Sequence, residues 1–157
     1  MARRLLMLAL AACLSAPAAA GAQTDDQRAV RAAVDHFLDV LGSRRLDELP
    51  GLFAAKATMV VVRQRDGQWT QTASTVDEFL ATLKGQATPT IFREPLTGVS
   101  VHVEDGHLAF LRADFTVVVD GAVRSHGVDY FTLVKDGAAW KLVNASYTSK
   151  NGPPPAK

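Results

Sequence analysis

The stretch Leu108–Thr148 decides the fold of this chain, and it reads LAFLRADFTVVVDGAVRSHGVDYFTLVKDGAAWKLVNASYT. Its runs of β-branched and aromatic residues are separated by two aspartate-glycine pairs, Asp120-Gly121 and Asp136-Gly137. This dipeptide is preferred in two-residue type I′ turns, because both central positions of such a turn need positive φ. The stretch therefore predicts three antiparallel strands joined by two tight hairpins.

The register of these strands follows if each aspartate-glycine pair forms the whole of its turn. The second turn then pairs Ala138 with Lys135. Counting outward places Asp129 opposite Arg112 on one side and opposite Asn144 on the other. Because side chains alternate between faces, this register assigns every residue to a face. The first face has an apolar end and a polar end, formed by Leu108, Phe110, Phe131, Leu133, Trp140 and Leu142, and by Arg112, Asp114, Asp129, Asn144 and Ser146.

The polar end of the first face predicts a pocket, because two carboxylates, an arginine and an amide converge there beside aromatic side chains. The second face is mostly apolar, and we expect a partner subunit to cover it in a homodimer. The residues of this second face are Leu111, Phe115, His126, Val128, Tyr130, Val143 and Tyr147.

Residues 1–22 are typical of an export signal. A basic start is followed by the apolar run Leu5–Ala12 and by an A-x-A cleavage site at Ala20–Ala22. The apolar run is shorter than the about 20 residues that a membrane span needs. Leu10–Cys13 resembles the lipobox of bacterial lipoproteins, but we favour soluble export to the periplasm or medium after cleavage near Ala22.

Removal of that segment takes away Arg3, Arg4 and Cys13, which is the single cysteine. The 17 basic residues fall to 15 against 16 acidic ones, a net charge of −1. The remaining sequence excludes disulfides and thiol chemistry, and it argues against nucleic acid as a partner. About 135 residues are enough for one domain with its own core.

Two capping boxes predict helices. The box at Thr24–Gln27 precedes an apolar stripe that reaches Leu41, and Gly42 ends the helix. A second box at Thr75–Glu78 opens a shorter helix that ends at Gly85.

A third helical segment is expected at Leu46–Ala54, interrupted by Pro50-Gly51. Further strands are predicted at residues 58–63, 69–72 and 99–104. The fold class is therefore α+β, with about three helices on the concave face of a curved antiparallel sheet of about six strands. Residues 23–150 form the domain, and the proline-rich residues 151–157 are expected to be disordered.

Several of these segments resemble a known superfamily. The capped first helix, the segment ending in Leu52-Phe53-Ala54 and the closing hairpin at residues 127–148 are similar to the nuclear transport factor 2-like superfamily, SnoaL-like branch. The hairpin is most similar to its putative lumazine-binding-like secreted members. The resemblance covers nearly the whole chain after residue 22 and implies a cone-shaped sheet with a pocket facing the first helix. It does not name an activity, because the superfamily includes isomerases, dehydratases, epoxide hydrolases and transport factors.

The resemblance allows known chemistries to be tested on this sequence. A steroid isomerase needs a general base, a tyrosine and a protonated aspartate. The aspartate falls on Asp129, but the tyrosine position is occupied by Phe37 and the base position lies near Val61. Without a base, we do not expect this isomerase chemistry.

A limonene epoxide hydrolase needs an Asp-Arg-Asp set. Arg112-Ala113-Asp114 is similar to the Arg-x-Asp of that family, and Asp129 offers the second carboxylate from the neighbouring strand. The interpretation we favour is a structural ion pair between Arg112 and Asp129. The four histidines lack metal-ligand spacing, so we expect neither a metal nor a cofactor.

Two functions remain open. We favour an exported module that binds a small, partly apolar molecule. The alternative is a cofactor-free hydrolase, dehydratase or isomerase whose catalytic residues are Asp129, Asp114 and Arg112. In either case we expect the ligand to contact Phe37, Phe110, Phe131, Trp140, Asn144 and Ser146.

Overall fold

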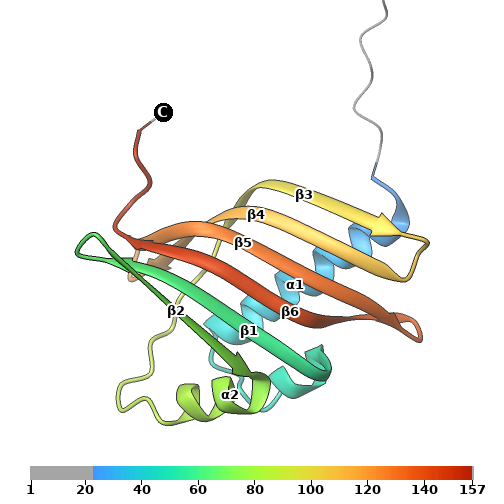
Figure 1. The fold of residues 1–157 in the computed structure, drawn as a ribbon, viewed down its shortest axis with the longest axis horizontal. Coiled ribbons are helices and arrows are strands. Elements are labelled where there is room, and N and C mark those ends of the chain that lie inside the picture. The colour runs from blue at the N-terminus through green and yellow to red at the C-terminus, as the bar shows by residue number, and fades with distance from the viewer. Residues whose placement is uncertain (1–22, 157) are drawn as a thin grey trace, which may run out of the picture.

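The computed structural model describes residues 23–156, which form two α-helices and one six-stranded sheet (Figure 1). The elements in chain order are α1 (Asp25–Gly42), the 3₁₀ turn η1 (Leu49–Leu52), β1 (Phe53–Arg65), β2 (Gln68–Thr75), α2 (Val76–Lys84), β3 (Leu96–Glu104), β4 (Leu108–Val119), β5 (Ala122–Asp136) and β6 (Ala139–Asn151). The predicted α+β fold class is confirmed.

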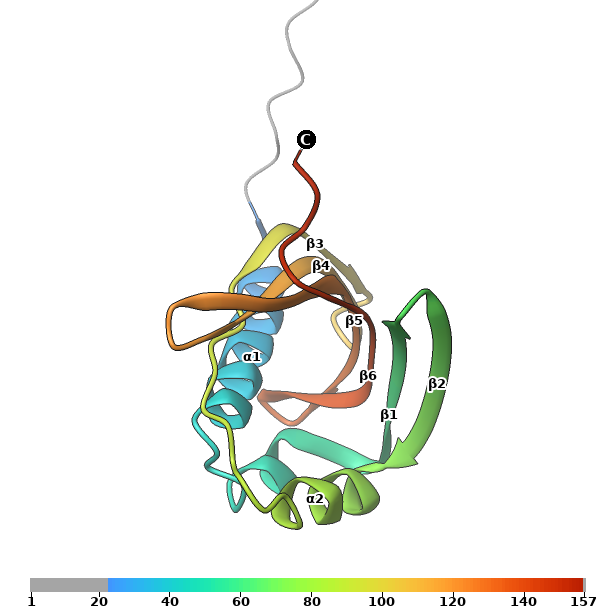
Figure 2. The same cartoon turned by 90° about the vertical axis from the view of Figure 1, so that its left-hand side faces the viewer.

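The sheet is curved and open, with the strand order β2-β1-β6-β5-β4-β3. Figure 2 shows it curling around α1, which lies on its concave side. Neighbouring strands are antiparallel except β1 and β6, which run parallel, so the prediction of a wholly antiparallel sheet is wrong at this pair. The parallel pair arises because the chain leaves the β1–β2 hairpin through α2, restarts at the far edge and returns as a meander that ends beside β1.

Helix α1 forms where its capping box predicts it. Thr24 Oγ1 accepts a hydrogen bond from the backbone N–H of Gln27 at 3.1 Å, and Gln27 Oε1 accepts one from the backbone N–H of Thr24 at 2.8 Å. The apolar stripe of the helix packs into the concave face, where burying each large side chain stabilises the fold by roughly 1.5–3 kcal/mol. The core between them includes Val30, Val34, Phe37, Leu38, Leu111, Phe131, Leu133, Leu142 and Ala145.

The helix predicted at Leu46–Ala54 is wrong. One 3₁₀ turn forms there, and β1 begins directly after it. Pro50 lacks a backbone N–H and Gly51 loses the most conformational freedom in a helix, so neither residue supports an α-helix. The apolar Leu49 and Phe53 are buried without one. The described residues therefore hold two α-helices and not about three.

The first predicted hairpin has the expected turn but a different register beyond it. Both residues of Asp120-Gly121 have positive φ, 50° and 77°, as a type I′ turn requires. A bulge at Arg124, an extra residue in β5, then shifts the pairing by one. Asp129 consequently pairs with Ala113 and not with Arg112.

The second hairpin turns one residue later than predicted. Asp136 pairs with Ala139, so the turn residues are Gly137 and Ala138, and Lys135 does not pair with Ala138. Gly137 has a φ of 59° whereas Ala138 keeps a negative one. A type II′ turn needs positive φ only at its first central position, which the glycine supplies.

The later turn moves the partner of Asp129 by two residues and a second register shift, in the β5–β6 pair, moves it by one more, so Asp129 lies opposite Tyr147 instead of Asn144. Because the side-chain period is two, these one-residue changes move side chains to the other face of the sheet. Asp129 lies on the concave face, whereas Arg112 and Asp114 lie on the outer face. The predicted polar end of a single face is therefore divided between two faces.

Candidate functional site

A pocket of about 710 Å³ lies on the concave face, beside the C-terminal half of α1. It is bounded by strands β1, β4, β5 and β6, by α2 and by the connection from α2 to β3. Most of its wall is apolar and comes from Phe37, Leu38, Leu41, Met59, Phe79, Leu83, Phe92, Phe115, Phe131 and Ala145. This size and composition are typical of small-molecule sites.

Asp129 lies in the wall of this pocket, near the middle of β5. It is 3% exposed and is the only buried polar or charged residue among residues 23–156. Within the same range, Asp129 Oδ2 meets no N–H or alcohol donor, and the side chain of Asp129 is hydrogen-bonded to the carboxyl group of Glu94. Because a charged carboxylate is poorly solvated there, burial raises the pKa of Asp129 from 3.8 to about 7.

Glu94, in the connection before β3, lies beside Asp129 in the pocket. Burial raises the pKa of Glu94 well above its usual range, and the charge of Asp129 raises it further. Two carboxyl groups in one poorly solvated site do not readily ionise together, because their charges repel. This carboxyl pair therefore retains a proton at pH values where surface carboxyl groups have lost theirs.

Two backbone contacts hold the connection that carries Glu94. The N–H of Phe92 donates to the carbonyl of Gly42 at the end of α1, at 3.0 Å. Arg93 exchanges two hydrogen bonds with Val118, of 3.0 and 2.8 Å. A Cβ at Gly42 would lie 2.4 Å from the carbonyl oxygen of Phe92, so the glycine permits this close approach. Glu94 was not predicted as a site residue; it lies between the predicted helix that ends at Gly85 and the predicted strand at residues 99–104.

Tyr147 and Arg63 extend the polar part of the pocket. Tyr147 pairs with Asp129 across β5 and β6, so the two side chains share the concave face. Arg63 Nη2 donates a hydrogen bond to Tyr147 Oη at 3.1 Å. Burial raises the pKa of Tyr147, so its phenol is neutral at physiological pH and can both donate and accept a hydrogen bond.

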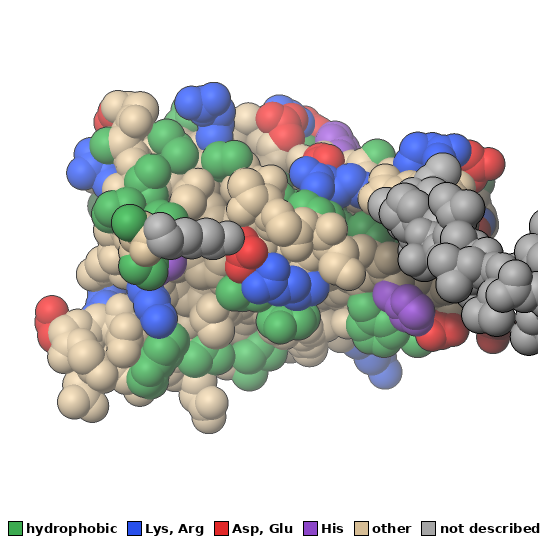
Figure 3. Space-filling model, turned by 90° about the horizontal axis from the view of Figure 1, so that it is seen from above, with side chains coloured by type: hydrophobic (Ala, Val, Ile, Leu, Met, Phe, Trp, Pro, Cys, Tyr) green, Lys and Arg blue, Asp and Glu red, His purple; other side chains and the backbone are tan. Residues whose placement is uncertain are grey.

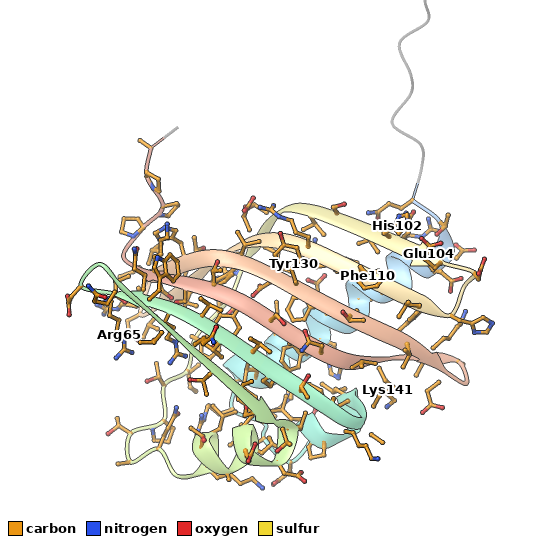
Figure 4. All side chains as sticks on the ribbon, in the orientation of Figure 1. Arg65, His102, Glu104, Phe110, Tyr130 and Lys141 are labelled. Atoms are coloured by element: carbon orange, nitrogen blue, oxygen red, sulfur yellow. The ribbon has the colours of Figure 1, made fainter. Side chains whose placement is uncertain are left out.

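Two of the four aromatic residues predicted to contact a ligand line this pocket. Phe37 and Phe131 meet edge to face, with ring centroids 6.0 Å apart. Trp140 is buried but lines a smaller hollow beside α1, with Lys135 Nζ 5.6 Å from its ring centroid. Phe110 is 45% exposed on the outer face, where Figure 4 labels it.

Arg112 and Asp114 form an ion pair of their own on the outer face. The two guanidinium nitrogens of Arg112 donate to the two carboxylate oxygens of Asp114 at 2.9 and 2.7 Å. The predicted ion pair between Arg112 and Asp129 is therefore wrong, because the bulge in β5 separates them. Neither Arg112 nor Asp114 lines the pocket that holds Asp129.

Asn144 and Ser146 also belong to the outer face. Asn144 Nδ2 donates to Thr58 Oγ1 at 2.9 Å, and Ser146 Oγ donates to Asn144 Oδ1. Neither residue lines the pocket. The bond from Asn144 to Thr58 connects β6 to β1 across the parallel pair.

Among residues 23–156, no three His, Cys, Asp or Glu side chains are grouped so that they could hold a metal ion. In that same part of the chain, neither helix is long and apolar enough to cross a bilayer.

A comparison with protein-family models identifies the family. The model described as "Putative lumazine-binding" matches residues 25–148, from the first residue of α1 almost to the end of β6. The chain belongs to this family. Its helix-lined curved sheet is that of the nuclear transport factor 2-like superfamily, so the predicted superfamily is confirmed. Among curated proteins, no sequence matches this chain.

Solved structures show the same fold at low sequence identity. A putative scytalone dehydratase from Novosphingobium aromaticivorans has a TM-score of 0.61 and 16% identity, over 78% of this chain and 82% of that one. The β subunit of a putative aromatic-ring-hydroxylating dioxygenase from the same species has a TM-score of 0.62 and 16% identity, over 83% and 92%. A nuclear transport factor 2-like protein with a cystatin-like fold, also from that species, has a TM-score of 0.60 and 18% identity, over 78% and 80%.

Asp129→Asn should change how the melting temperature depends on pH. Folding raises the pKa of Asp129 from 3.8 to about 7. Its protonation therefore stabilises the fold fully below about pH 4, and this contribution is lost as the pH rises through about 7. Because asparagine does not ionise, its contribution to the stability of the fold does not change over that pH range. The melting temperature of the variant, relative to wild type, should rise by several degrees between about pH 4 and about pH 8.

The matched control is Asp136→Asn, which makes the same change at the exposed end of the same strand. Its melting temperature relative to wild type should stay nearly constant with pH. An equally flat difference for Asp129→Asn in differential scanning calorimetry would contradict a buried, protonated Asp129.

Proposed function

We propose that this protein binds a small molecule with a partly apolar ring, whose polar edge hydrogen-bonds to the carboxyl pair of Asp129 and Glu94. The observation that carries the proposal is the buried carboxyl pair: Asp129 Oδ2 lies in an apolar wall without an N–H or alcohol donor among the described residues, and the side chain of Asp129 is hydrogen-bonded to the carboxyl group of Glu94. A buried polar group left without a partner costs about 1–3 kcal/mol. A ligand N–H or hydroxyl would remove that cost.

Two further observations support a ring-shaped ligand. The edge-to-face pair of Phe37 and Phe131 presents aromatic surface to the pocket, which favours contact with another ring. The family description names lumazine, a bicyclic ring with N–H donors and carbonyl acceptors. One ring edge can meet the carboxyl pair while both ring faces contact apolar side chains.

Lumazine is accordingly the first ligand to test. We expect the wild-type protein to bind it at about pH 6, where the carboxyl pair still holds a proton. Asp129→Leu should weaken binding about tenfold or more, because leucine offers no acceptor for a ligand N–H or hydroxyl group. Titration by the intrinsic fluorescence of lumazine measures both affinities.

Asp136→Leu, at the exposed end of the same strand, is the control and should bind lumazine as the wild type does. A panel of uncharged bicyclic ring ketones and phenols, screened by thermal shift, covers other ring ligands. The proposal is wrong if neither lumazine nor any panel compound binds, or if Asp129→Leu binds them all unchanged.

A second candidate function is supported by the pairing of Glu94 with Asp129. Two carboxyl groups that share one proton can supply a general acid and a general base from one site. The hypothesis of an enzyme using Asp129, Asp114 and Arg112 therefore keeps Asp129 but takes Glu94 as its second carboxyl group. Arg112 and Asp114 lie on the other face of the sheet. The reaction class would be cofactor-free proton transfer next to a carbonyl, as in isomerases and dehydratases.

This candidate predicts proton exchange without any added cofactor. A ring ketone incubated with the protein in heavy water should gain deuterium next to its carbonyl, detectable by nuclear magnetic resonance. Both Glu94→Gln and Asp129→Asn should abolish the exchange, because each removes one member of the carboxyl pair. Exchange that survives in either variant, or fails in the wild type for every ketone that binds, would leave only the binding function.

We also propose that the protein is exported and forms a homodimer through the outer face of the sheet. Residues 1–22 support export by their sequence. Phe110 and Tyr130 support the dimer, being 45% and 56% exposed on the outer face (Figure 4). Native mass spectrometry of the periplasmic fraction should show twice the mass of residues 23–157. A monomeric mass contradicts the dimer, and an uncleaved chain contradicts export.

The surface first predicted for the dimer requires correction. Leu111, Phe115 and Tyr147 lie on the concave face, two of them buried and Tyr147 in the pocket wall. Of the residues assigned to that surface, Val128 and Tyr130 lie on the outer face, on the same side as Phe110.

A further inference from the structure

Three arginines line the outer end of the pocket: Arg63 and Arg65 at the end of β1, and Arg124 at the start of β5. We call them the arginine rim. The end of β1 and the start of β5 lie on either side of the end of β6, where Arg63 of β1 pairs with Ser149 of β6. The rim therefore gathers at one end of the sheet, and Figure 4 labels Arg65 at the β1–β2 hairpin there.

The charge of the rim is not balanced by acidic neighbours. Among residues 23–156, no Asp or Glu lies within ion-pair distance of any rim arginine. By contrast, Arg28 and Arg31 on α1 each pair with an aspartate. The guanidinium group stays charged at all physiological pH values. Among the described residues, Asp129 and Glu94 are the only acidic side chains that line the pocket, and Arg44 lines it together with the three rim arginines, so the lining as a whole is positive.

This positive end is not part of a generally basic surface. The chain has a formal net charge of only +1. The face in Figure 3 shows acidic and basic side chains interspersed among apolar ones. A local excess of positive charge at the mouth of a pocket concentrates anions there.

We propose that the ligand is an organic anion, whose acidic oxygen group binds the arginine rim while its ring extends inward to the carboxyl pair. This inference rests on the proposed function and adds the charge of the ligand and its orientation. Arginine suits the role because its planar donors can hold two oxygens of a carboxylate, sulfonate or phosphate at once. Ser125, Ser149 and Asn151 line the same end and offer further hydrogen-bond donors.

The strand geometry sets the length of this ligand. Ser149, beside Arg63, lies two residues beyond Tyr147, which pairs with Asp129. The rim thus begins about 7 Å along the sheet from the carboxyl pair. Ser125, next to Arg124, is four residues from Asp129, which is about 13 Å. One or two fused rings with an acidic group at the far end match this span.

Two fluorescent probes test the charge of the ligand directly. They are 8-anilino-1-naphthalenesulfonate and N-phenyl-1-naphthylamine, which differ only by the sulfonate. Neither probe needs a hydrogen bond to Asp129, so the rim is tested apart from the carboxyl pair. The double variant Arg65→Gln/Arg124→Gln should bind the sulfonate about tenfold more weakly and the neutral amine unchanged. This double variant keeps Arg63 and its hydrogen bond to Tyr147.

The control is Arg28→Gln/Arg31→Gln, which removes the same charge from the exposed side of α1 and should bind both probes as the wild type does. Raising the salt concentration from about 20 to about 500 mM should lower the affinity for the sulfonate probe and leave that for the neutral amine unchanged. Competition by 2-naphthoate and by 2-naphthyl phosphate then tells which acidic group the rim prefers.

The outcomes separate this inference from the proposed function. Suppose that the wild type binds the neutral amine, but the rim variant binds the sulfonate with unchanged affinity or loses affinity equally for both probes. The inference of an anionic ligand is then wrong, and the proposal of a ring-binding pocket stands. If neither probe binds the wild type although lumazine does, the inference of an anionic ligand fails and the proposed function stands. If lumazine and the panel compounds fail to bind as well, both proposals fail.

Discussion

The structure depends on the packing of one amphipathic helix against part of a curved sheet. The stripe of α1 fills one end of the concave face, and the helix ends at Gly42 before the other end is covered. A sheet must bury its apolar face against something. At the uncovered end, within the part of the chain that the structure describes, α2 and the connection before β3 approach the strands, and the space between them is the pocket. The pocket is thus the part of the core that no helix fills.

Carboxyl groups in the wall of this poorly solvated pocket destabilise the folded state. The rise in the pKa of Asp129 from 3.8 to about 7 corresponds to a few kcal/mol at neutral pH, which is a large part of the stability of an ordinary domain. Among residues 23–156, no positively charged side chain forms an ion pair with Asp129, in contrast to the paired Arg112 and Asp114 on the outer face. A strongly perturbed pair of carboxyl groups beside an apolar cavity is more typical of a functional site than of a structural one.

The sequence predicted what depends on local signals. The cap at Thr24, the turn at Asp120-Gly121 and the superfamily all follow from short motifs. The division of the polar residues between two faces does not follow from such motifs, because a bulge has no strong propensity signal. One inserted residue moves every later side chain of the strand to the opposite face of the sheet. Glu94 was missed for a similar reason. In its extended segment the apolar Ile91 is 67% exposed while the acidic residue points inward, against the usual hydrophobic pattern.

The bulge at Arg124 determines both ends of the candidate site. In a regular hairpin, Asp129 would face Arg112, and the two would form an ion pair that occupies each charge. The extra residue turns Asp129 into the apolar concave face and leaves Arg112 to bind Asp114 outside. The inserted residue is itself a rim arginine. One local irregularity in β5 thus separates the carboxyl pair from the arginine rim along the pocket. A ligand with a polar ring edge and an acidic end can then contact both, in place of the ion pair between Asp129 and Arg112 that a regular hairpin would form.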